Sequence, residues 1–159
     1  GVAKQRVTLL DAGICRGVVY DSQTAARDGV ASTGHGLPAP NPWGPFPLNM
    51  VMAGGEATLD ELIGGLERGL LVTRFHYTNP VHPKLAIVTG MTRDGTFLVE
   101  KGEIVSAVKN FRFHESPLRV FRQVESWTPP MEAVTSETGK MLVPAMALPR
   151  FTFSSVTRF

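Results

Sequence analysis

Four histidines and one cysteine are the side chains of this 159-residue chain best suited to bind a metal or transfer a proton. They are His35, His76, His82, His114 and Cys15. A helical zinc motif needs two histidines about one turn apart with a glutamate as base, and the sequence contains no such pair. His76 and His82 flank a proline-bearing segment that we interpret as a polar loop, although a tight loop can in principle bring two imidazoles to one metal. The sequence therefore shows no catalytic centre.

Two further segments have residue types that can do chemistry. Residues 32–36, Ser-Thr-Gly-His-Gly, lack the order of a nucleophile elbow and the Gly-Lys ending of a phosphate loop, so we interpret them as a turn. Thr33, Gly34 and His35 stay candidate loop residues. Cys15 has no adjacent histidine, and we interpret it as a buried or partly buried structural thiol.

Composition limits the classes of protein to which the chain can belong. Hydrophobic residues make up 43% and charged residues 19%, which is typical of a globular domain. Without a run of about 18 apolar residues we expect no membrane span, and with scattered cations and a net charge of +2 we expect no direct binding to nucleic acid. A single cysteine excludes an internal disulfide and fits the cytoplasm. The first residue is not methionine, so we expect a fragment of a longer chain.

Local signals predict short elements in the first half of the chain. Residues 6–20 form two apolar segments around a turn, which predicts a β-hairpin. Asp21 is placed to cap a short helix, and the proline- and glycine-rich residues 29–47 predict an irregular surface loop. Residues 58–61, Thr-Leu-Asp-Glu, match a capping box and begin an amphipathic helix that stops at Gly69.

The second half predicts mostly strands. Arg93-Asp94-Gly95 and Lys101-Gly102 have the composition of hairpin turns, and Ser116-Pro117 begins a helix that runs to about Ser126. The expected strands cover residues 70–75, 85–90, 96–100, 103–108, 141–147 and 151–156. This order predicts a β-rich α+β domain with an antiparallel meander and two or three short helices. A meander with a spare edge can bind an extended peptide as one more strand.

Several segments together resemble the C-terminal domain of the TldD/PmbA family. The similar segments are residues 10–20, Ser32-Thr33-Gly34, residues 45–49 with Gly54-Gly55, residues 69–73 (Gly-Leu-Leu-Val-Thr) and residues 98–104 (Leu-Val-Glu-Lys-Gly-Glu-Ile). The resemblance covers nearly the whole chain and implies a single C-terminal domain over residues 1–159. Family members are metalloprotease-like proteins that trim or degrade small peptides, and they were first named modulators of DNA gyrase.

The resemblance also implies a zinc site in the metal-binding branch of the family. It consists of an upstream helix with two histidines and a cysteine near the C-terminus, in a Cys-Gly-Lys context. Here the matching segment is Glu137-Thr138-Gly139-Lys140, with Thr138 in place of the cysteine. A neutral hydroxyl is a poor zinc ligand compared with a thiolate. This departure favours the metal-free PmbA (TldE) side of the family, and a divergent homologue is the alternative. We expect no cofactor in this fragment, with zinc possible in the full-length protein or in a partner.

The resemblance implies the following function. We expect a C-terminal domain of a TldD/PmbA-type metallopeptidase that forms part of the peptide-handling cleft and the dimer, without metal ligands of its own and inactive alone. The expected partners are peptides and a second subunit, identical or TldD-like, with interface surface at Met50-Val51-Met52 and around Phe111–Phe113. One alternative is an interaction module linked to DNA gyrase modulation, and another is the wall of a hydrolase whose zinc site lies upstream. The candidate cleft or loop residues are Thr33, Gly34, His35, His76, Thr138 and Lys140.

Overall fold

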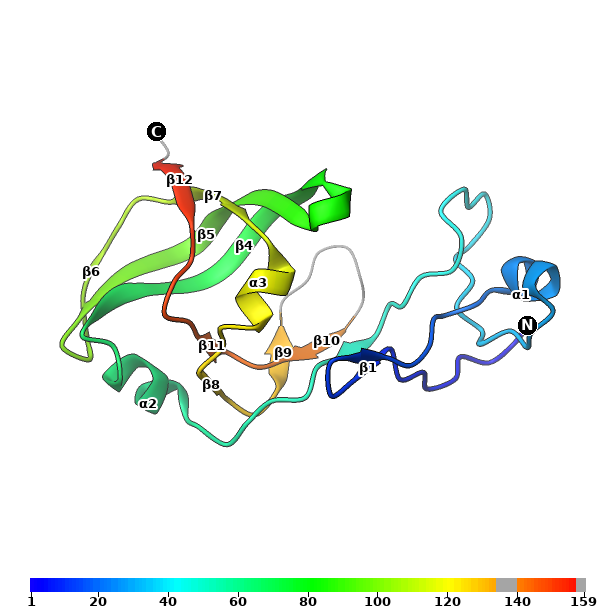
Figure 1. Ribbon diagram of the computed structural model, residues 1–159, viewed down its shortest axis with the longest axis horizontal. Coiled ribbons are helices and arrows are strands. Elements are labelled where there is room, and N and C mark those ends of the chain that lie inside the picture. The colour runs from blue at the N-terminus through cyan, green and yellow to red at the C-terminus, as the bar shows by residue number, and fades with distance from the viewer. Residues whose placement is uncertain (134–139, 157–159) are drawn as a thin grey trace. The chain divides into compact units, whose positions relative to one another are not determined.

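The computed structural model describes residues 1–133 and 140–156. The chain divides into two compact units (Figure 1). The first consists of Gly1–Val51 with Glu132–Leu142, and the second of Met52–Met131 with Val143–Phe159. None of the helices in the described ranges has the length and apolar character needed to cross a bilayer.

The first unit begins with the predicted hairpin and helix. Strands β1 (Leu10–Asp11) and β2 (Ile14–Cys15) pair antiparallel around a tight turn, and helix α1 (Ser22–Asp28) follows. The Asp21 carboxylate accepts a hydrogen bond from the Thr24 amide at 2.7 Å, as predicted for a helix cap. Cys15 is exposed, so the expectation of a buried or partly buried thiol is wrong. Its strand belongs to a two-stranded hairpin whose strand residues are all exposed, as is typical of an isolated strand pair.

Residues 30–49 contain no helix or strand, which confirms the predicted irregular loop. Strand β3 (Met50–Val51) follows it and pairs in parallel with β10 (Met141–Val143), which also pairs with β9 (Met131–Ala133). The single strand predicted over residues 141–147 is divided into β10 and β11 (Met146–Ala147). Pro144 lies at the division, where it has no N–H to continue a ladder.

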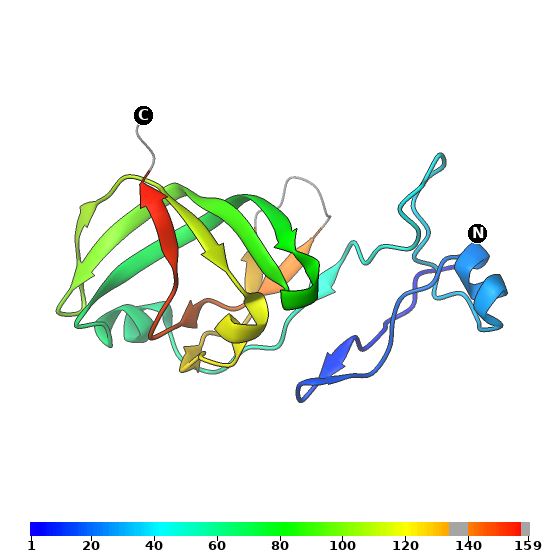
Figure 2. The same cartoon turned by 45° about the horizontal axis from the view of Figure 1, so that its top comes forward.

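The second unit is built on a five-stranded antiparallel sheet in the order β12-β7-β5-β4, with β6 also paired to β5 (Figure 2). A short 3-10 helix, η1 (Pro83–Leu85), joins β4 to β5, and the predicted Lys101-Gly102 turn joins β5 to β6. The β-rich α+β architecture is confirmed. The strands of the sheet are β4 (Arg68–His82), β5 (Ile87–Glu100), β6 (Glu103–Ala107), β7 (Phe111–Glu115) and β12 (Phe153–Val156).

Two segments predicted as a turn and a loop lie inside long strands. β5 continues through Asp94 and Gly95, which together face Thr73 of β4, so the predicted hairpin turn is wrong and the segment is a β-bulge. Asp94 and Gly95 have positive φ (64° and 156°), which explains why their composition resembled a turn. The segment between His76 and His82, interpreted as a polar loop, is part of β4 and contains a second bulge at Tyr77 (φ 53°).

The core of the second unit includes a cluster of phenylalanine rings on one face of the sheet. Phe75 contacts Phe113 with ring centroids 4.7 Å apart and Phe151 at 5.3 Å. The Phe113 ring lies over Gly90, where a Cβ atom would be 2.6 Å from the ring. Phe113 is 2% exposed and belongs to the core. The expectation that it forms part of an exposed interface is therefore wrong.

Two helices and a second strand pair complete this unit. Helix α2 (Leu59–Gly64) has the predicted capping box but ends one turn before Gly69, and helix α3 (Pro117–Phe121) is shorter than expected. Strand β8 (Ser126–Trp127) pairs with β11. Gly54 lies against the backbone carbonyl of Thr128, and a Cβ atom at Gly54 would be 2.0 Å from that oxygen. The close approach explains why this position has no side chain.

Candidate functional site

The Thr33-Gly34-His35 turn is held to the backbone of Tyr20 in the first unit. The Thr33 hydroxyl accepts from the Tyr20 amide at 2.7 Å and donates to the Tyr20 carbonyl at 3.0 Å. Its oxygen also lies 2.9 Å from Nδ1 of His35. When the single hydroxyl proton is given to the carbonyl, Nδ1 is the donor in this third contact. Thr33 is therefore occupied in holding the turn together.

Gly34 is needed at its position for two reasons. Its φ of 73° is left-handed, and a Cβ atom would lie 2.4 Å from the Ala3 carbonyl oxygen. The neighbouring Thr33 carbonyl accepts a hydrogen bond from the Gln5 amide at 3.0 Å. The turn therefore fastens the first residues of the chain, and His35 is nearly buried within it (9% exposed).

The other predicted site residues belong to other parts of the chain. His76 belongs to the second unit, on β4, opposite Met91 of β5. Lys140 is exposed in the first unit, 3.6 Å from Glu132, and Thr138 lies outside the described residues. The structure brings Thr33, Gly34 and His35 together in one turn of the first unit.

The described residues do not fit the zinc site that the family resemblance implies. Within residues 1–133 and 140–156, no three side chains of His, Cys, Asp or Glu are grouped to hold a metal ion. His82 instead uses Nδ1 to accept a hydrogen bond from the Leu85 amide at 3.3 Å, which caps η1. We therefore derive no chemical step through a metal in this domain.

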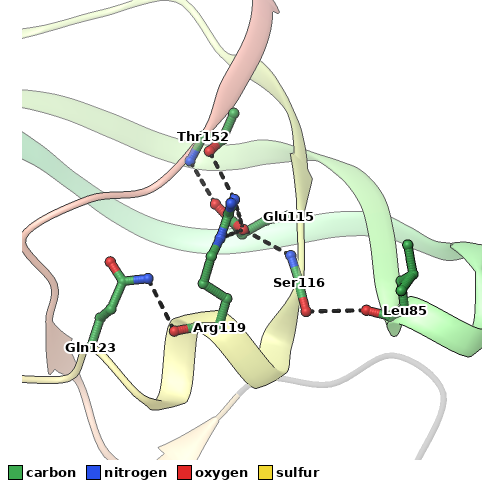
Figure 3. A network of polar contacts seen from close by, with 6 residues as sticks. All are labelled: Leu85, Glu115, Ser116, Arg119, Gln123 and Thr152. Carbon is green, nitrogen blue, oxygen red and sulfur yellow. Dashed lines mark hydrogen bonds and ion pairs between the residues drawn. The ribbon is translucent and has the colours of Figure 1, made fainter.

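A buried carboxylate that sequence reasoning missed lies at the end of β7 (Figure 3). The Glu115 side chain is 3% exposed, and it accepts from the Ser116 amide at 2.8 Å and the Thr152 amide at 3.0 Å. Arg119 of α3 donates to it through Nε at 2.9 Å and also through Nη2. Because Thr152 is 37 residues away in sequence, spacing gave no signal beyond the Glu-to-Arg i,i+4 pair.

The Glu115 network holds its carboxylate ionised. Burial by itself raises the pKa of Glu115, but the hydrogen bonds from Ser116, Arg119 and Thr152 outweigh burial, and the pKa lies below its ordinary value. An ionised carboxylate whose oxygens are both engaged is a poor proton donor or acceptor. Glu115 therefore joins β7, α3 and the segment before β12, and we assign it a structural role.

The β5 bulge is fixed by polar contacts on both sides. The hydroxyls of Thr92 and Thr96 are 2.8 Å apart, and both threonines are almost fully buried. Thr92 also accepts from the Phe111 amide at 3.0 Å, which connects the bulge to β7. Arg74 of β4 pairs with Asp94 at 2.6 Å. These contacts stabilise the bulge, whose extra residue belongs to β5, the strand between β4 and β7.

The outer edge of β4 is the structural feature with the clearest capacity to bind another molecule. In the described part of the chain, β4 pairs with β5 only, so its other edge has no strand partner. Residues 68–76 keep a regular β4 backbone, because the bulge opposite Thr73 belongs to β5 and the first bulge of β4 itself comes at Tyr77. Unpaired N–H and C=O groups along such an edge are available to an extended chain.

Comparison with known proteins agrees with this architecture. Residues 1–155 match the family described as PmbA/TldA metallopeptidase C-terminal domain. None of the curated proteins compared with the chain matches it. The family match covers nearly the whole chain, so the chain is classified as a C-terminal domain of a metallopeptidase family. The chain belongs to the PmbA/TldA family, which confirms the TldD/PmbA resemblance seen in the sequence.

Solved structures share the fold at low sequence identity. One is TldE from Thermococcus kodakarensis, with 22% identity and a TM-score of 0.80 over 98% of this chain and 35% of that chain. A candidate modulator of a DNA gyrase from Thermotoga maritima has 19% identity and a TM-score of 0.76, over 96% of this chain and 34% of that one. Another from Bacteroides thetaiotaomicron has 22% identity and a TM-score of 0.68, over 98% and 32%. The chain therefore spans about a third of the length of these proteins.

Proposed function

We propose that this domain binds an extended peptide along the free edge of β4 and so forms part of the peptide-handling cleft of a TldD/PmbA-type metallopeptidase. The observation that carries the proposal is the regular edge over residues 68–76, which no strand of the described residues pairs with. Peptide N–H and C=O groups would complete the hydrogen bonds of β4, and main-chain pairing depends little on side-chain identity. Such binding suits a protein that handles peptides of varied sequence.

In this proposal the domain supplies no metal ligands and is inactive alone. Support comes from the described residues, which group no metal-binding set, and from Thr138 at the position of the family cysteine. Zinc would then belong to the full-length protein or to a TldD-like subunit in a homo- or heterodimer. We place this assembly in the cytoplasm, as the single cysteine indicates.

Hydrogen exchange of the 159-residue chain with and without an extended peptide of about eight residues tests the proposal, since that length covers nearly all of residues 68–76 at one residue per strand position. We expect slower exchange of β4 amides in this range. The control is the same peptide methylated at alternate amide nitrogens on the edge that would pair with β4, which removes its donors. Absence of protection on β4 at saturating peptide, or equal protection by the methylated peptide, would overturn the proposal.

A second candidate function is that of an interaction module linked to DNA gyrase. Two solved structures with this fold carry the description of candidate modulators of DNA gyrase. Pull-down of purified gyrase by the 159-residue chain tests this function. Binding that persists without any peptidase partner would favour it over the peptide-cleft proposal. The other alternative is that a zinc site lies upstream in the full-length chain and that this domain forms the wall of a hydrolase. That alternative is compatible with peptide binding by β4.

A further inference from the structure

This inference rests on the proposed function and concerns which peptides the β4 edge accepts. In a sheet, successive side chains of each strand point to opposite faces, and an added strand places its side chains beside those of its neighbour. The side chains that flank the free edge of β4 therefore decide which peptide side chains fit. Arg74 and Phe75 are consecutive residues of the regular part of this edge, and they point to opposite faces.

The face with Arg74 is positively charged. Arg74 lies opposite Arg93 of β5. On the same face, His76 of β4 lies opposite Met91 of β5, which in turn lies opposite Arg112 of β7. Asp94, which follows Arg93 on β5, pairs with both Arg74 (2.6 Å) and Arg93 (3.7 Å). The Arg74 side chain is 32% exposed, and its Nε is buried without a partner. Two arginines on one carboxylate leave a net positive charge beside the edge.

The opposite face is apolar at the same edge. Phe75 is 45% exposed although its ring contacts Phe113 and Phe151. An apolar side chain of an added strand would cover the exposed side of Phe75 and extend the aromatic cluster by one residue. Burying this surface is favourable at about 25 cal/mol per Å².

We propose that the β4 edge selects peptides in which acidic and apolar side chains alternate. An Asp or Glu of the added strand lies beside Arg74, and the next residue, which is apolar, lies beside Phe75. Main-chain pairing supplies the common affinity, and this alternation supplies the preference. The preference depends on charge and is weakened by salt, since Arg74 is partly exposed to solvent.

Three labelled peptides of about eight residues test the preference by fluorescence anisotropy, with hydrogen exchange of β4 as the second readout. The first alternates Asp and Val, the second alternates Lys and Val, and the third contains four Asp followed by four Val. We expect the first to bind about tenfold more tightly than the second, from one or two exposed ion pairs gained and the matching repulsions avoided. It should also bind more tightly than the third, which has the same composition without the alternation.

Variants on the same face assign the preference to Arg74. Arg74→Gln should reduce the difference between the Asp and Lys peptides to about twofold, and Arg74→Lys should keep most of it because the charge remains. Arg112→Gln is the matched control, since Arg112 shares the face but lies on β7, two strands from the edge. It should leave the difference unchanged.

The outcomes separate this inference from the function on which it rests. Peptides that protect β4 equally, whatever their charge and pattern, would overturn the inference and leave β4 as a peptide-binding edge. If Arg74→Gln keeps the full preference while Arg112→Gln removes it, the inference is also overturned, and β4 is still a peptide-binding edge. Peptides that leave β4 exchange unchanged would overturn the proposed function itself.

Discussion

Glu115 is the buried charge on which three segments of the second unit depend. Replacing it with alanine leaves the amides of Ser116 and Thr152 without their acceptor and Arg119 without its partner. We expect Glu115→Ala to lower the free energy of unfolding by about 2 to 4 kcal/mol. Urea denaturation measures the change. Glu103→Ala, at an exposed carboxylate, is the control and should stay within about 0.5 kcal/mol of the parent.

The same carboxylate predicts how stability responds to acid. The pKa of Glu115 is lower in the folded chain than its ordinary value of 4.5, so its contribution is present above that value and is lost as the pH falls through the folded pKa. We expect acidification to destabilise the parent more than Glu115→Gln, which cannot titrate. The pKa values of Asp21 and Glu61 are also lowered, but these groups are common to both proteins. Equal acid sensitivity of parent and variant would contradict the assignment.

Gly90 is required by its neighbour's ring rather than by backbone conformation. A Cβ atom at this position would lie 2.6 and 2.7 Å from two atoms of the Phe113 ring, and Phe113 is held in the core. We expect Gly90→Ala to cost about 1 to 3 kcal/mol in thermal or urea denaturation. Gly64→Ala is the matched control, because a Cβ atom at Gly64 contacts nothing within 4 Å. It should be neutral or stabilise helix α2 by about 0.5 to 1 kcal/mol.

Sequence reasoning at the residue scale succeeded where both partners lie within a few positions of each other. The caps at Asp21 and Thr58 are of this kind, because the amide that each side chain accepts from is three residues ahead. Glu115 was assigned no role, since its contact with Thr152 depends on how β12 returns to β7. Long-range polar contacts follow from topology, which the sequence pattern alone did not specify.

At the scale of elements, the capping box of α2 offers a direct test. The Thr58 hydroxyl accepts from the Glu61 amide at 3.2 Å, and the Glu61 carboxylate accepts from the Thr58 amide at 2.7 Å. We expect Thr58→Ala to destabilise the chain by about 1 kcal/mol, measured by urea denaturation. Thr58→Ser, which keeps the hydroxyl, should recover most of the loss. An alanine variant as stable as the parent would mean that α2 does not depend on this cap.

At this scale the sequence pattern, through its alternation of apolar residues, predicts most strands of the main sheet but not the residues at which they end. The composition of Asp94-Gly95 predicts a turn as readily as a bulge, because the left-handed conformation that it favours occurs in both. What decides between them is whether β4 is long enough to run past the bulge, and β4 is 15 residues long. The length of the partner strand is a tertiary property.

At the scale of the whole molecule, metal content tests the expectation that this domain supplies no zinc ligands. We expect the purified 159-residue chain to contain well under one equivalent of zinc by elemental analysis. Thr138→Cys alone should not create peptide hydrolysis, because one thiolate without the upstream histidines does not complete a zinc site. Stoichiometric zinc in the chain, or activity in Thr138→Cys, would contradict both the expectation and the proposed division of labour. The full-length protein assayed on the same day serves as the reference.

The family and fold class could be predicted from sequence because they depend on many weak segments read together over the whole chain. The candidate site could not, because the free edge of β4 is defined by what the rest of the fold leaves unpaired. Histidines and hydroxyls are candidates for reactive groups by residue type. In the structure, however, Thr33 stabilises a turn and His82 caps a 3-10 helix. Main-chain groups carry no residue signature, so a binding edge is visible only in three dimensions.

The regular outer edge of β4 also has a consequence for how the protein behaves in concentrated solution. An edge that can receive a peptide can equally receive the edge of another copy, which is the first step of precipitation. Arg68 and Arg74 on this strand act as gatekeepers, because edges brought together also bring like charges together. Salt screens that repulsion, so the solubility of the isolated chain should fall as ionic strength rises, and a peptide that occupies the edge should restore it.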